Sequence, residues 1–498
     1  MMRKALEQPN RLALIDPDKP ANSLTYGALR EKVIAFAAYF REQGLAPGRM
    51  VLLNTDPGDQ IPDLVAFLAL TAISAGVYVS SAKSVVEQEV VGRLGIEFEI
   101  SSSERKGSTR RMVAIPDSVF PAETPSAAGS SAVHPDALHL PWLVRSTSGT
   151  TGVPKIFITT QGQAAFRRQR YFCATGLTEA AVFMSFTPIR FGAARQRAFY
   201  ALSQGASVVI QPRDPSITAL VQAARQCKAT HLYCVPMYLA LMCRNAQELR
   251  DLSQEFPLLP NALNLESSSS VITPELSAAI RSLVSPNFSN SYSISEVGHI
   301  SSTRLCSNAA ADQGLNNIGV AVDGVEIAIV NEQFENLPAG KQGRIAVRFT
   351  DRPTEVAYLN QEMRWISEVR DGFFIPGDLG YISPGGNLIY EGRADDMMVF
   401  NGINIFPTEI ERAASSNRAI VEAAAFGVES DISGQVPCVA VVLSHDVPLD
   451  ELFSGFQRTL GPRAPRHMFK ASSLPRNPMG KVLRRELARQ AKDILSRR

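Results

Sequence analysis

Short runs rich in β-branched residues alternate with longer helical patterns, and this alternation limits the possible folds more than any other feature of the chain. Strand-like runs lie at residues 51–53, 207–210, 231–235 and 344–349. In such a chain each helix returns the backbone to the edge where the next strand begins, so neighbouring strands run parallel. We therefore expect an α/β fold with mixed or largely parallel sheets. Because 498 residues are too many for one compact core, we also expect at least two domains.

The character of the sequence changes after about residue 393. Two strand-like runs, 423–428 and 436–443, precede a helical tail. Apolar residues recur on one face of that tail at Leu483, Leu487, Ala491 and Leu495. We therefore expect a large N-terminal portion of several subdomains, residues 1–393, and a small C-terminal α/β domain, residues 394–498.

The composition argues against several classes of protein. Lys and Arg number 50 and Asp and Glu 48, which leaves a net charge of +2 and no large field for nucleic acid or an anionic membrane. The start of the chain has no signal-peptide pattern, and the longest uncharged run, residues 64–79, is shorter than a membrane span. We expect that run to be a buried helix opened by Pro62 and ended near Gly76, followed by a short strand. The six cysteines show no C-x-x-C spacing, which argues against zinc and disulfides and fits the cytoplasm.

A nine-residue segment rich in hydroxyl groups and glycine is the strongest local motif. It consists of Thr147, Ser148, Gly149, Thr150, Thr151, Gly152, Val153, Pro154 and Lys155. Glycines let backbone N–H groups approach an anion, hydroxyls add donors and the lysine adds positive charge, which together suit the outer phosphates of a nucleotide. The segment is not a Walker A loop, because Pro154 lies between Gly152 and Lys155. Strand-like residues on both sides predict a hairpin-like turn, and the alternative is an ordinary surface turn.

Five further motifs follow this segment along the chain. They are Asn-Ser-Tyr-Ser-Ile-Ser-Glu at 290–296, Gly-Asp-Leu-Gly-Tyr at 377–381, Gly-Arg-Ala-Asp-Asp at 392–396, Asn-Gly-Ile-Asn at 401–404 and Pro-Met-Gly-Lys at 478–481. Through these motifs the chain resembles the adenylate-forming superfamily, which includes acyl- and aryl-CoA synthetases, adenylation domains of peptide synthetases, and luciferases. The matching segments extend from about residue 24 to residue 485.

The resemblance implies an AMP-forming acid–thiol ligase. Such an enzyme uses ATP and Mg²⁺ to join a small carboxylic acid to AMP, and then transfers the acyl group to the thiol of coenzyme A. Repulsion between the carboxylate and the polyphosphate is the main obstacle, so positive charge and a metal ion must offset it at the reacting phosphorus.

The resemblance also implies roles for single residues around the ATP. The segment from Thr147 to Lys155 would hold the β- and γ-phosphates, and Glu296 would bind Mg²⁺. Ser295 would lie beside the α-phosphate, and Tyr292 would pack on the adenine. Without its motif, Glu296 would be interpreted as an exposed loop carboxylate.

Three residues further along complete the implied active site. Asp378 would accept hydrogen bonds from both ribose hydroxyls, and Arg393 would reach the ribose or the phosphates. Lys481 would bridge the acid carboxylate and the α-phosphate, and with Glu296 and Thr147 it is an expected catalytic residue. The alternatives are an Asx turn at Asp378 and a surface ion pair at Arg393.

The family pattern places a hinge at Asp395. Around it the C-terminal domain would swing as a mobile lid between acid activation and thiol transfer. Gly402 would let a pantetheine arm pass in the second state, and the alternative is an ordinary turn glycine.

Three departures from the family pattern bear on these roles. The adenine segment, usually rich in Gly and Ala, has serine throughout 267–270, so we expect backbone contacts at Ser269 without glycine-specific geometry. Ser293 and Ser295 replace a usual glycine and threonine, and both changes keep a small residue. Asn404 stands where many CoA synthetases direct an arginine toward the phosphates.

The acid-binding region is expected just before and at Gly192. Peptide-synthetase adenylation domains place an aspartate there for the α-amino group, so a standard α-amino acid is disfavoured. Acyl-CoA synthetases often carry a histidine gate nearby, whereas this chain has Pro-Ile-Arg-Phe at 188–191. Our hypothesis is that Arg190, beside Phe191, faces the pocket and recognises a second polar or anionic group on the acid. The alternative is a solvated loop arginine.

Other functions stay open on the sequence alone. The acceptor thiol could be the phosphopantetheine of a carrier protein instead of CoA. A non-catalytic nucleotide-binding protein and an ordinary phosphotransferase are further alternatives, and the latter would release ADP where adenylation releases pyrophosphate. The joint presence of Lys155, Glu296, Asp378, Arg393 and Lys481 argues against a non-catalytic protein. The identity of the acid and the oligomeric state are not predicted.

Overall fold

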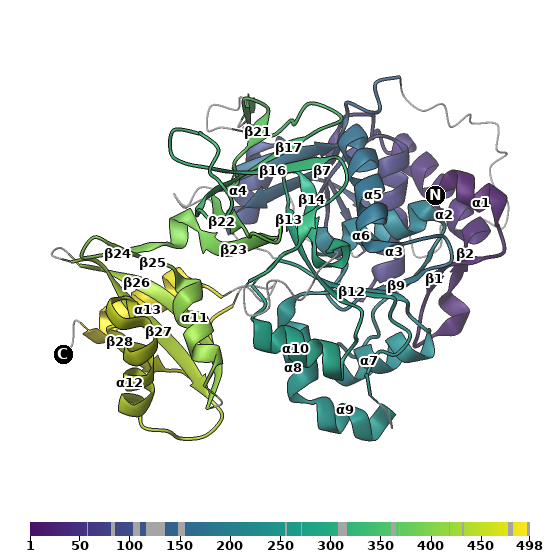
Figure 1. Cartoon of the computed structure of the whole chain (residues 1–498). Coiled ribbons are helices and arrows are strands. Elements are labelled where there is room, and N and C mark those ends of the chain that lie inside the picture. The colour runs from purple at the N-terminus through teal and green to yellow at the C-terminus, as the bar shows by residue number, and fades with distance from the viewer. Residues whose placement is uncertain are drawn as a thin grey trace.

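The computed structural model describes residues 1–56, 58–80, 85–102, 110–115, 135–147, 155–253, 256–269, 271–306, 316–359, 365–367, 369–417, 419–430, 433–476 and 482–495. In these residues a large N-terminal domain is built on three sheets and a small C-terminal domain on one, which confirms the predicted α/β fold class. Figure 1 shows the C-terminal domain, in yellow and light green, beside the larger domain.

The first sheet has nine strands and carries the alternation seen in the sequence. Its order is β15 (Val320–Ala321), β14 (Gly298–Ser302), β13 (Phe288–Ile294), β12 (Asn264–Ser267), β11 (His231–Cys234), β9 (Val182–Ser185), β10 (Ser207–Val209), β1 (Leu12–Ile15) and β2 (Leu24–Thr25). The strands from β13 to β1 run parallel, as predicted, and β2, β14 and β15 are antiparallel edges. The helices between its strands are α5 (Gln161–Thr175), α6 (Gly192–Gln204), α7 (Ile217–Gln226), α8 (Pro236–Arg244), α9 (Ala246–Ser253) and α10 (Pro274–Leu283).

The second sheet has eight strands and holds both ends of the hydroxyl-rich segment. Its order is β19 (Trp365–Ser367), β18 (Ala357–Leu359), β8 (Lys155–Thr160), β7 (Pro141–Thr147), β4 (Gly76–Val79), β3 (Met50–Leu53), β5 (Phe98–Ser101) and β6 (Arg111–Ala114). Strands β7 and β8 are antiparallel, and Thr147 pairs with Lys155. The segment therefore joins two hydrogen-bonded strands, as the hairpin prediction requires.

The uncharged run at residues 64–79 lies inside the N-terminal domain. The other helices of this part of the chain are α1 (Met2–Glu7), α2 (Tyr26–Glu42) and α4 (Val85–Arg93). The run forms most of α3 (Gln60–Ala72), which is buried from Asp63 to Leu70, and then β4. The predicted helix and strand are present, but the helix begins two residues before Pro62 and ends four residues before Gly76. Among all described residues, no helix is both long and apolar enough to cross a membrane.

The third sheet is antiparallel. Its strands are β20 (Val369–Arg370), β21 (Phe373–Phe374), β17 (Gly343–Phe349), β22 (Asp378–Ile382) and β23 (Leu388–Arg393), with β16 (Val325–Val330) paired to β17. The predicted strand at 344–349 is present as β17. It runs antiparallel to its neighbours, and the consecutive strands β16 and β17 are joined by residues 331–342, which contain no helix.

The C-terminal domain has a sheet of its own. Its elements are β24 (Met398–Phe400), β25 (Ile403–Ile405), α11 (Pro407–Ser415), β26 (Ile420–Ser430), β27 (Gly434–Leu443), α12 (Leu449–Leu460), β28 (His467–Lys470) and α13 (Arg484–Leu495). The last strand of the third sheet ends at Arg393, and a short 3₁₀ turn, Ala394–Asp396, leads to β24. Of the four residues expected on one face of this tail, Leu487 and Ala491 are buried on α13, Leu495 is partly buried at its end, and Leu483 precedes the helix and is 42% exposed. The boundary at residue 393 and the mobility of the lid stay predictions.

Strand β12 offers a matched test of the core. Leu265 is fully buried in the apolar cluster behind the first sheet, and Leu263, two residues earlier, is 63% exposed. We expect Leu265→Ala to lower the apparent free energy of unfolding by about 3 kcal/mol, because it removes buried methyl groups and leaves a cavity. Leu263→Ala should change it by less than about 0.5 kcal/mol. Denaturant unfolding followed by circular dichroism measures both, and equal effects would contradict this packing.

Candidate active site

Two cavities meet beyond the carboxyl ends of β12 and β13. The interdomain cavity, about 530 Å³, lies between the two domains and is lined by residues that include Tyr292, Asp378, Tyr390, Arg393, Glu411 and Arg484. The inner cavity, about 360 Å³, lies within the N-terminal domain and is lined by residues that include Arg145, Arg167, Tyr171, Arg190, Gln196 and Arg197. Ser269, Ser293 and Ile294 line both. Ligands of open α/β sheets bind at this edge, so the two cavities together form the candidate site.

Asp378 lines the interdomain cavity and lies at the centre of a cluster of polar side chains. Its carboxylate is buried, and the Tyr292 hydroxyl donates to Oδ2 at 2.5 Å. The Tyr390 hydroxyl is 3.5 Å from Oδ1 and Arg393 Nη1 is 3.7 Å from the same oxygen. Burial and the negative charge of Asp378 raise the pKa of Tyr292 well above 10, so this hydroxyl stays a donor. The sequence correctly grouped Asp378, Tyr292 and Arg393, but it gave no sign of Tyr390.

Arg393 links this carboxylate to the start of the C-terminal domain. It donates to the Pro376 carbonyl at 3.3 Å, and its Nη2 is 4.0 Å from Asp395 Oδ2. Burial opposes the guanidinium charge, but Asp378 and the other acidic neighbours outweigh it and raise the pKa of Arg393. The expected hinge residue Asp395 is exposed in the 3₁₀ turn.

Tyr358 joins the hydroxyl-rich segment to the expected metal ligand. Its hydroxyl donates to Glu296 Oε1 at 2.5 Å, and Lys155 Nζ lies 5.2 Å from the centre of its ring. Lys155 and Glu296, 141 positions apart, are therefore neighbours of the same aromatic side chain. Tyr358 belongs to none of the sequence motifs, so it could not be identified from the sequence.

The structure does not describe several of the expected site residues. Ser148, Gly149, Thr150, Thr151, Gly152 and Lys481 lie outside the described residues. Thr147 is described only as the backbone end of β7. Their roles stay predictions.

Arg167 fixes the chain just after β13. From α5 this buried guanidinium donates to the Thr159 hydroxyl and the Ser295 carbonyl, each at 3.1 Å, and to the Glu296 carbonyl. Gly298 has φ +89°, and a Cβ there would lie 3.1 Å from Arg167 Cδ, so glycine is needed for this approach. Arg167 was not identified from the sequence, because an arginine within a helix is normally solvated.

Arg145 lies beside Arg167 in the wall of the inner cavity. It donates to Gln196 Oε1 at 2.9 Å and to the Ser295 carbonyl at 3.4 Å. Burial and the neighbouring Arg167 lower the pKa of Arg145 to about 10, which leaves it charged at neutral pH. The inner cavity is therefore positively charged next to Ser295.

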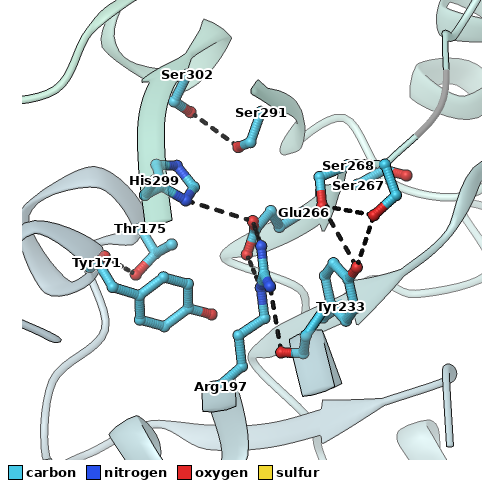
Figure 2. Close-up of polar contacts among 12 residues, drawn as sticks. Tyr171, Thr175, Arg197, Tyr233, Glu266, Ser267, Ser268, Ser291, His299 and Ser302 are labelled. Atoms are coloured by element: carbon cyan, nitrogen blue, oxygen red, sulfur yellow. Dashed lines mark hydrogen bonds and ion pairs between the residues drawn. The ribbon is translucent and has the colours of Figure 1, made fainter. Parts of the chain in front are cut away.

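Arg197, another residue of this wall, forms a buried ion pair with Glu266 behind it (Figure 2). Arg197 Nε donates to Glu266 Oε2 at 3.0 Å, and a second nitrogen of the same guanidinium donates to Oε1. Burial disfavours the charged form of both groups, but the opposite charge of the partner favours that form more strongly. The pKa of Glu266 is therefore lowered and that of Arg197 is raised. His299 Nδ1 lies 3.8 Å from Glu266 Oε1 on the other side of the carboxylate.

The serine segment that begins at the last residue of β12 departs from our expectation. Ser267 donates to the Cys234 carbonyl at 2.8 Å, and Ser268 and Ser269 lie 3.3 and 3.5 Å from the Tyr233 hydroxyl. Ser269 has φ +85°, a left-handed conformation that favours glycine. Glycine-like geometry is thus kept at Ser269, and the expectation that serine would remove it is wrong.

The residues expected around the acid all line the inner cavity. Arg190 and Phe191 precede α6, and Gly192 is its first residue. A Cβ at Gly192 would lie 3.3 Å from Arg145 Nε, so a larger residue would press on that arginine.

Gly402 and Asn404 line neither cavity. Asn401 and Gly402, with φ +49° and +77°, form the two-residue turn between β24 and β25, which by itself accounts for the glycine. Asn404 is exposed in β25. The pantetheine role of Gly402 stays a prediction.

Known proteins resemble this chain over most of its length. A family described as AMP-binding enzyme matches residues 1–350, and one described as AMP-binding enzyme C-terminal domain matches residues 409–481. Acyl-coenzyme A synthetase ACSM5, mitochondrial, of Mus musculus is 28% identical over 69% of this chain, which spans 60% of that relative's length. The salicyl-AMP ligase / salicyl-S-ArCP synthetase of Mycobacterium tuberculosis is 26% identical over 97% of this chain and 88% of that protein. The solved structure of o-succinylbenzoate CoA synthetase from Bacillus subtilis with an acyl-adenylate intermediate shares the fold, with 22% identity, coverage of 98% and 97%, and a TM-score of 0.81.

His299 makes the stability of this site depend on pH. Burial lowers its pKa from 6.5 to about 4, so the unfolded chain binds this proton more tightly than the folded one. The stabilisation is complete above pH 6.5 and is lost as the pH falls toward 4. Between pH 7 and pH 5 the wild type should lose about 2 kcal/mol more of its free energy of unfolding than His299→Gln. Denaturant unfolding at the two pH values measures this, and an equal loss in both proteins would contradict it.

Proposed function

The chain belongs to the AMP-binding enzyme family, and we propose that it is an ATP-dependent acid–CoA ligase. It joins a carboxylic acid to AMP with release of pyrophosphate, and then transfers the acyl group to the thiol of coenzyme A. Relatives named as acyl- and aryl-CoA ligases support this activity.

The junction of the two cavities carries the proposal. A nucleotide whose ribose lies at Asp378 would extend its α-phosphate toward Ser293 and Ser269, and an acid in the inner cavity would present its carboxylate at the same residues. Bringing these two groups together replaces a slow encounter by a reaction within one complex. A single nucleotide cavity without the inner cavity would have no such place for an acid.

The positive charge near Ser295 suits the chemistry. Attack of a carboxylate oxygen on the α-phosphorus brings two anions together, and pyrophosphate leaves with the electron pair of the broken P–O bond. Arg145 and Arg167 are held close to this place by their bonds to the Ser295 carbonyl. Fixed charges in a buried site stabilise the developing negative charge without reorganising, so we assign them an electrostatic role.

Mg²⁺ fits Glu296 only in combination with a nucleotide. Tyr358 occupies Oε1 of this carboxylate, which leaves Oε2 for a metal. Within the described ranges no three His, Cys, Asp or Glu residues gather to hold a metal by themselves. Magnesium commonly takes one or two carboxylates and completes its shell with phosphate oxygens and water, and that arrangement is available here. When bound, it would neutralise phosphate charge.

The acceptor thiol has a second candidate. A carrier-protein phosphopantetheine presents the same thiol arm as coenzyme A, and the relative named salicyl-S-ArCP synthetase aligns with 97% of this chain. The Asp395 hinge and the passage at Gly402 belong to this thiol-transfer step in our proposal.

The direct test is a screen of diverse acids for pyrophosphate release, with and without CoA. Release of pyrophosphate and AMP that depends on the acid, with thioester formed only when CoA is present, is the expected result. Release of ADP would assign a phosphotransferase instead. Thioester formation on carrier proteins but not on CoA would select the second acceptor.

Asp378 is the residue on which nucleotide binding should depend most. Asp378→Asn removes the charge that accepts hydrogen bonds at the ribose position, and such bonds to charged groups contribute about 1.5–3 kcal/mol. We expect KM for ATP to rise by about 10-fold or more, measured by pyrophosphate release. The exposed Asp323→Asn is the matched control and should leave KM unchanged. Similar KM values for both variants would remove Asp378 from the nucleotide site.

Lys481 should separate the two half-reactions. We expect Lys481→Ala to abolish acid-dependent pyrophosphate release, while thiol attack on a supplied acyl-adenylate is largely kept. Pyrophosphate release and thioester formation from the supplied adenylate measure the two steps. Equal loss of both would contradict the proposed bridging role.

A further inference from the structure

Three arginines crowd the start of α6, and two of them are neutralised by buried acids. Arg195 is fully buried, with Nη1 2.6 Å from Asp63 Oδ2. Arg197 is held by Glu266, as Figure 2 shows. The third, Arg190, forms no ion pair with any acid in the described part of the chain, and its Nε is buried there without a hydrogen-bond partner.

Arg190 is also less exposed than a fully solvated loop arginine. It is partly buried, it lines the inner cavity, and its guanidinium lies 5.3 Å from the ring centre of Phe191. Burying an unpaired cation is costly unless another group satisfies it. Since the protein supplies no acid here among the residues described, a ligand in the cavity is the natural partner.

The cavity wall carries more positive charge than one carboxylate can balance. Arg145 and Arg167 line the same cavity and donate to carbonyls, a threonine hydroxyl and a glutamine oxygen, not to a carboxylate. Both reach the Ser295 carbonyl, next to the junction with the interdomain cavity, where the reacting carboxylate would lie. Arg190 is not tied to that junction by any hydrogen bond to Ser295 or Glu296 within the described residues. It is therefore available to a second negative group.

We propose that the acid activated by this protein carries a second anionic group, in the simplest case a second carboxylate, and that Arg190 binds it. The inference rests on the proposed function, because it concerns the acid end of the same site. A guanidinium matches a carboxylate with two parallel N–H···O bonds, which a neutral acid cannot use. The inner cavity, about 360 Å³, is at the small end of ligand sites, so the class is small dicarboxylic acids.

Matched pairs of acids test this specificity. Acid-dependent pyrophosphate release is measured with succinate and butyrate, glutarate and pentanoate, and phthalate and benzoate. The proteins are the wild type, Arg190→Met, which keeps an unbranched side chain but removes the guanidinium charge, and Arg41→Met, a matched change at an exposed arginine outside both cavities. Arg190→Gln is a second variant, and circular dichroism confirms that each protein is folded.

The wild type should prefer one or more diacids over the matched monoacid by about 10-fold or more in kcat/KM. Arg190→Met should lower kcat/KM for that diacid by about 10- to 100-fold and change the monoacid value by less than about threefold. Arg41→Met should behave as the wild type. Equal use of both acids in every pair, or a diacid preference unchanged in both Arg190 variants, would overturn the inference while pyrophosphate release still supported the ligase.

Absence of pyrophosphate release with all acids would instead overturn the proposed function. Calorimetric titration of the same diacids into the wild type and Arg190→Met then decides the inference by itself. Binding that is lost in Arg190→Met supports an anion site at Arg190, whereas equal binding, or none to the wild type, removes it.

Discussion

The carboxyl end of β13 is held from both sides, and the rest of the site depends on it. On one side Arg167 donates to the Ser295 and Glu296 carbonyls and to Thr159 of the second sheet. On the other side the Tyr292 hydroxyl donates to Asp378 of the third sheet. These bonds connect all three sheets of the N-terminal domain at the strand that separates the two cavities. A shift of this strand would move the nucleotide side and the acid side together.

Buried positive charge is the second constraint on this region. The whole chain carries a net charge of only +2, yet several guanidinium groups gather around the inner cavity. Each buried charge must be compensated, and the protein does this unevenly. Arg195 and Arg197 receive carboxylates, Arg167 receives carbonyls and a hydroxyl, and Arg190 receives no acid from the described residues. The arginines that bind groups of the protein stabilise the fold, and in our proposal Arg190 binds a ligand instead.

The sequence predicted the α/β class, two strands of the first sheet, one strand in each of the other two sheets of the N-terminal domain, and the hairpin around the hydroxyl-rich segment, because these follow from local periodicity and turn chemistry. It also grouped Tyr292, Asp378 and Arg393, because their motifs come in a recognisable order. Tyr358 and Arg167 could not be found in this way. Tyr358 bonds to Glu296, 62 positions away, and Arg167 bonds to the Ser295 and Glu296 carbonyls, 128 and 129 positions away, so nothing local marks these site contacts. The left-handed Ser269 was wrongly interpreted, because residue type alone does not determine the backbone conformation of a serine.

If a carboxylate and an α-phosphate react at Ser269 and Ser293, one oxygen atom of the acid must end in the AMP. In the first step a carboxylate oxygen forms the new bond to phosphorus, and in the second the thiol breaks the bond between that oxygen and the acyl carbon. An acid identified by the screen is therefore labelled with ¹⁸O in both carboxylate oxygens and incubated with ATP, Mg²⁺ and CoA. Mass spectrometry of the nucleotide should find one ¹⁸O in each AMP formed. Unlabelled AMP, or ADP with labelled phosphate, would contradict adenylation at this junction.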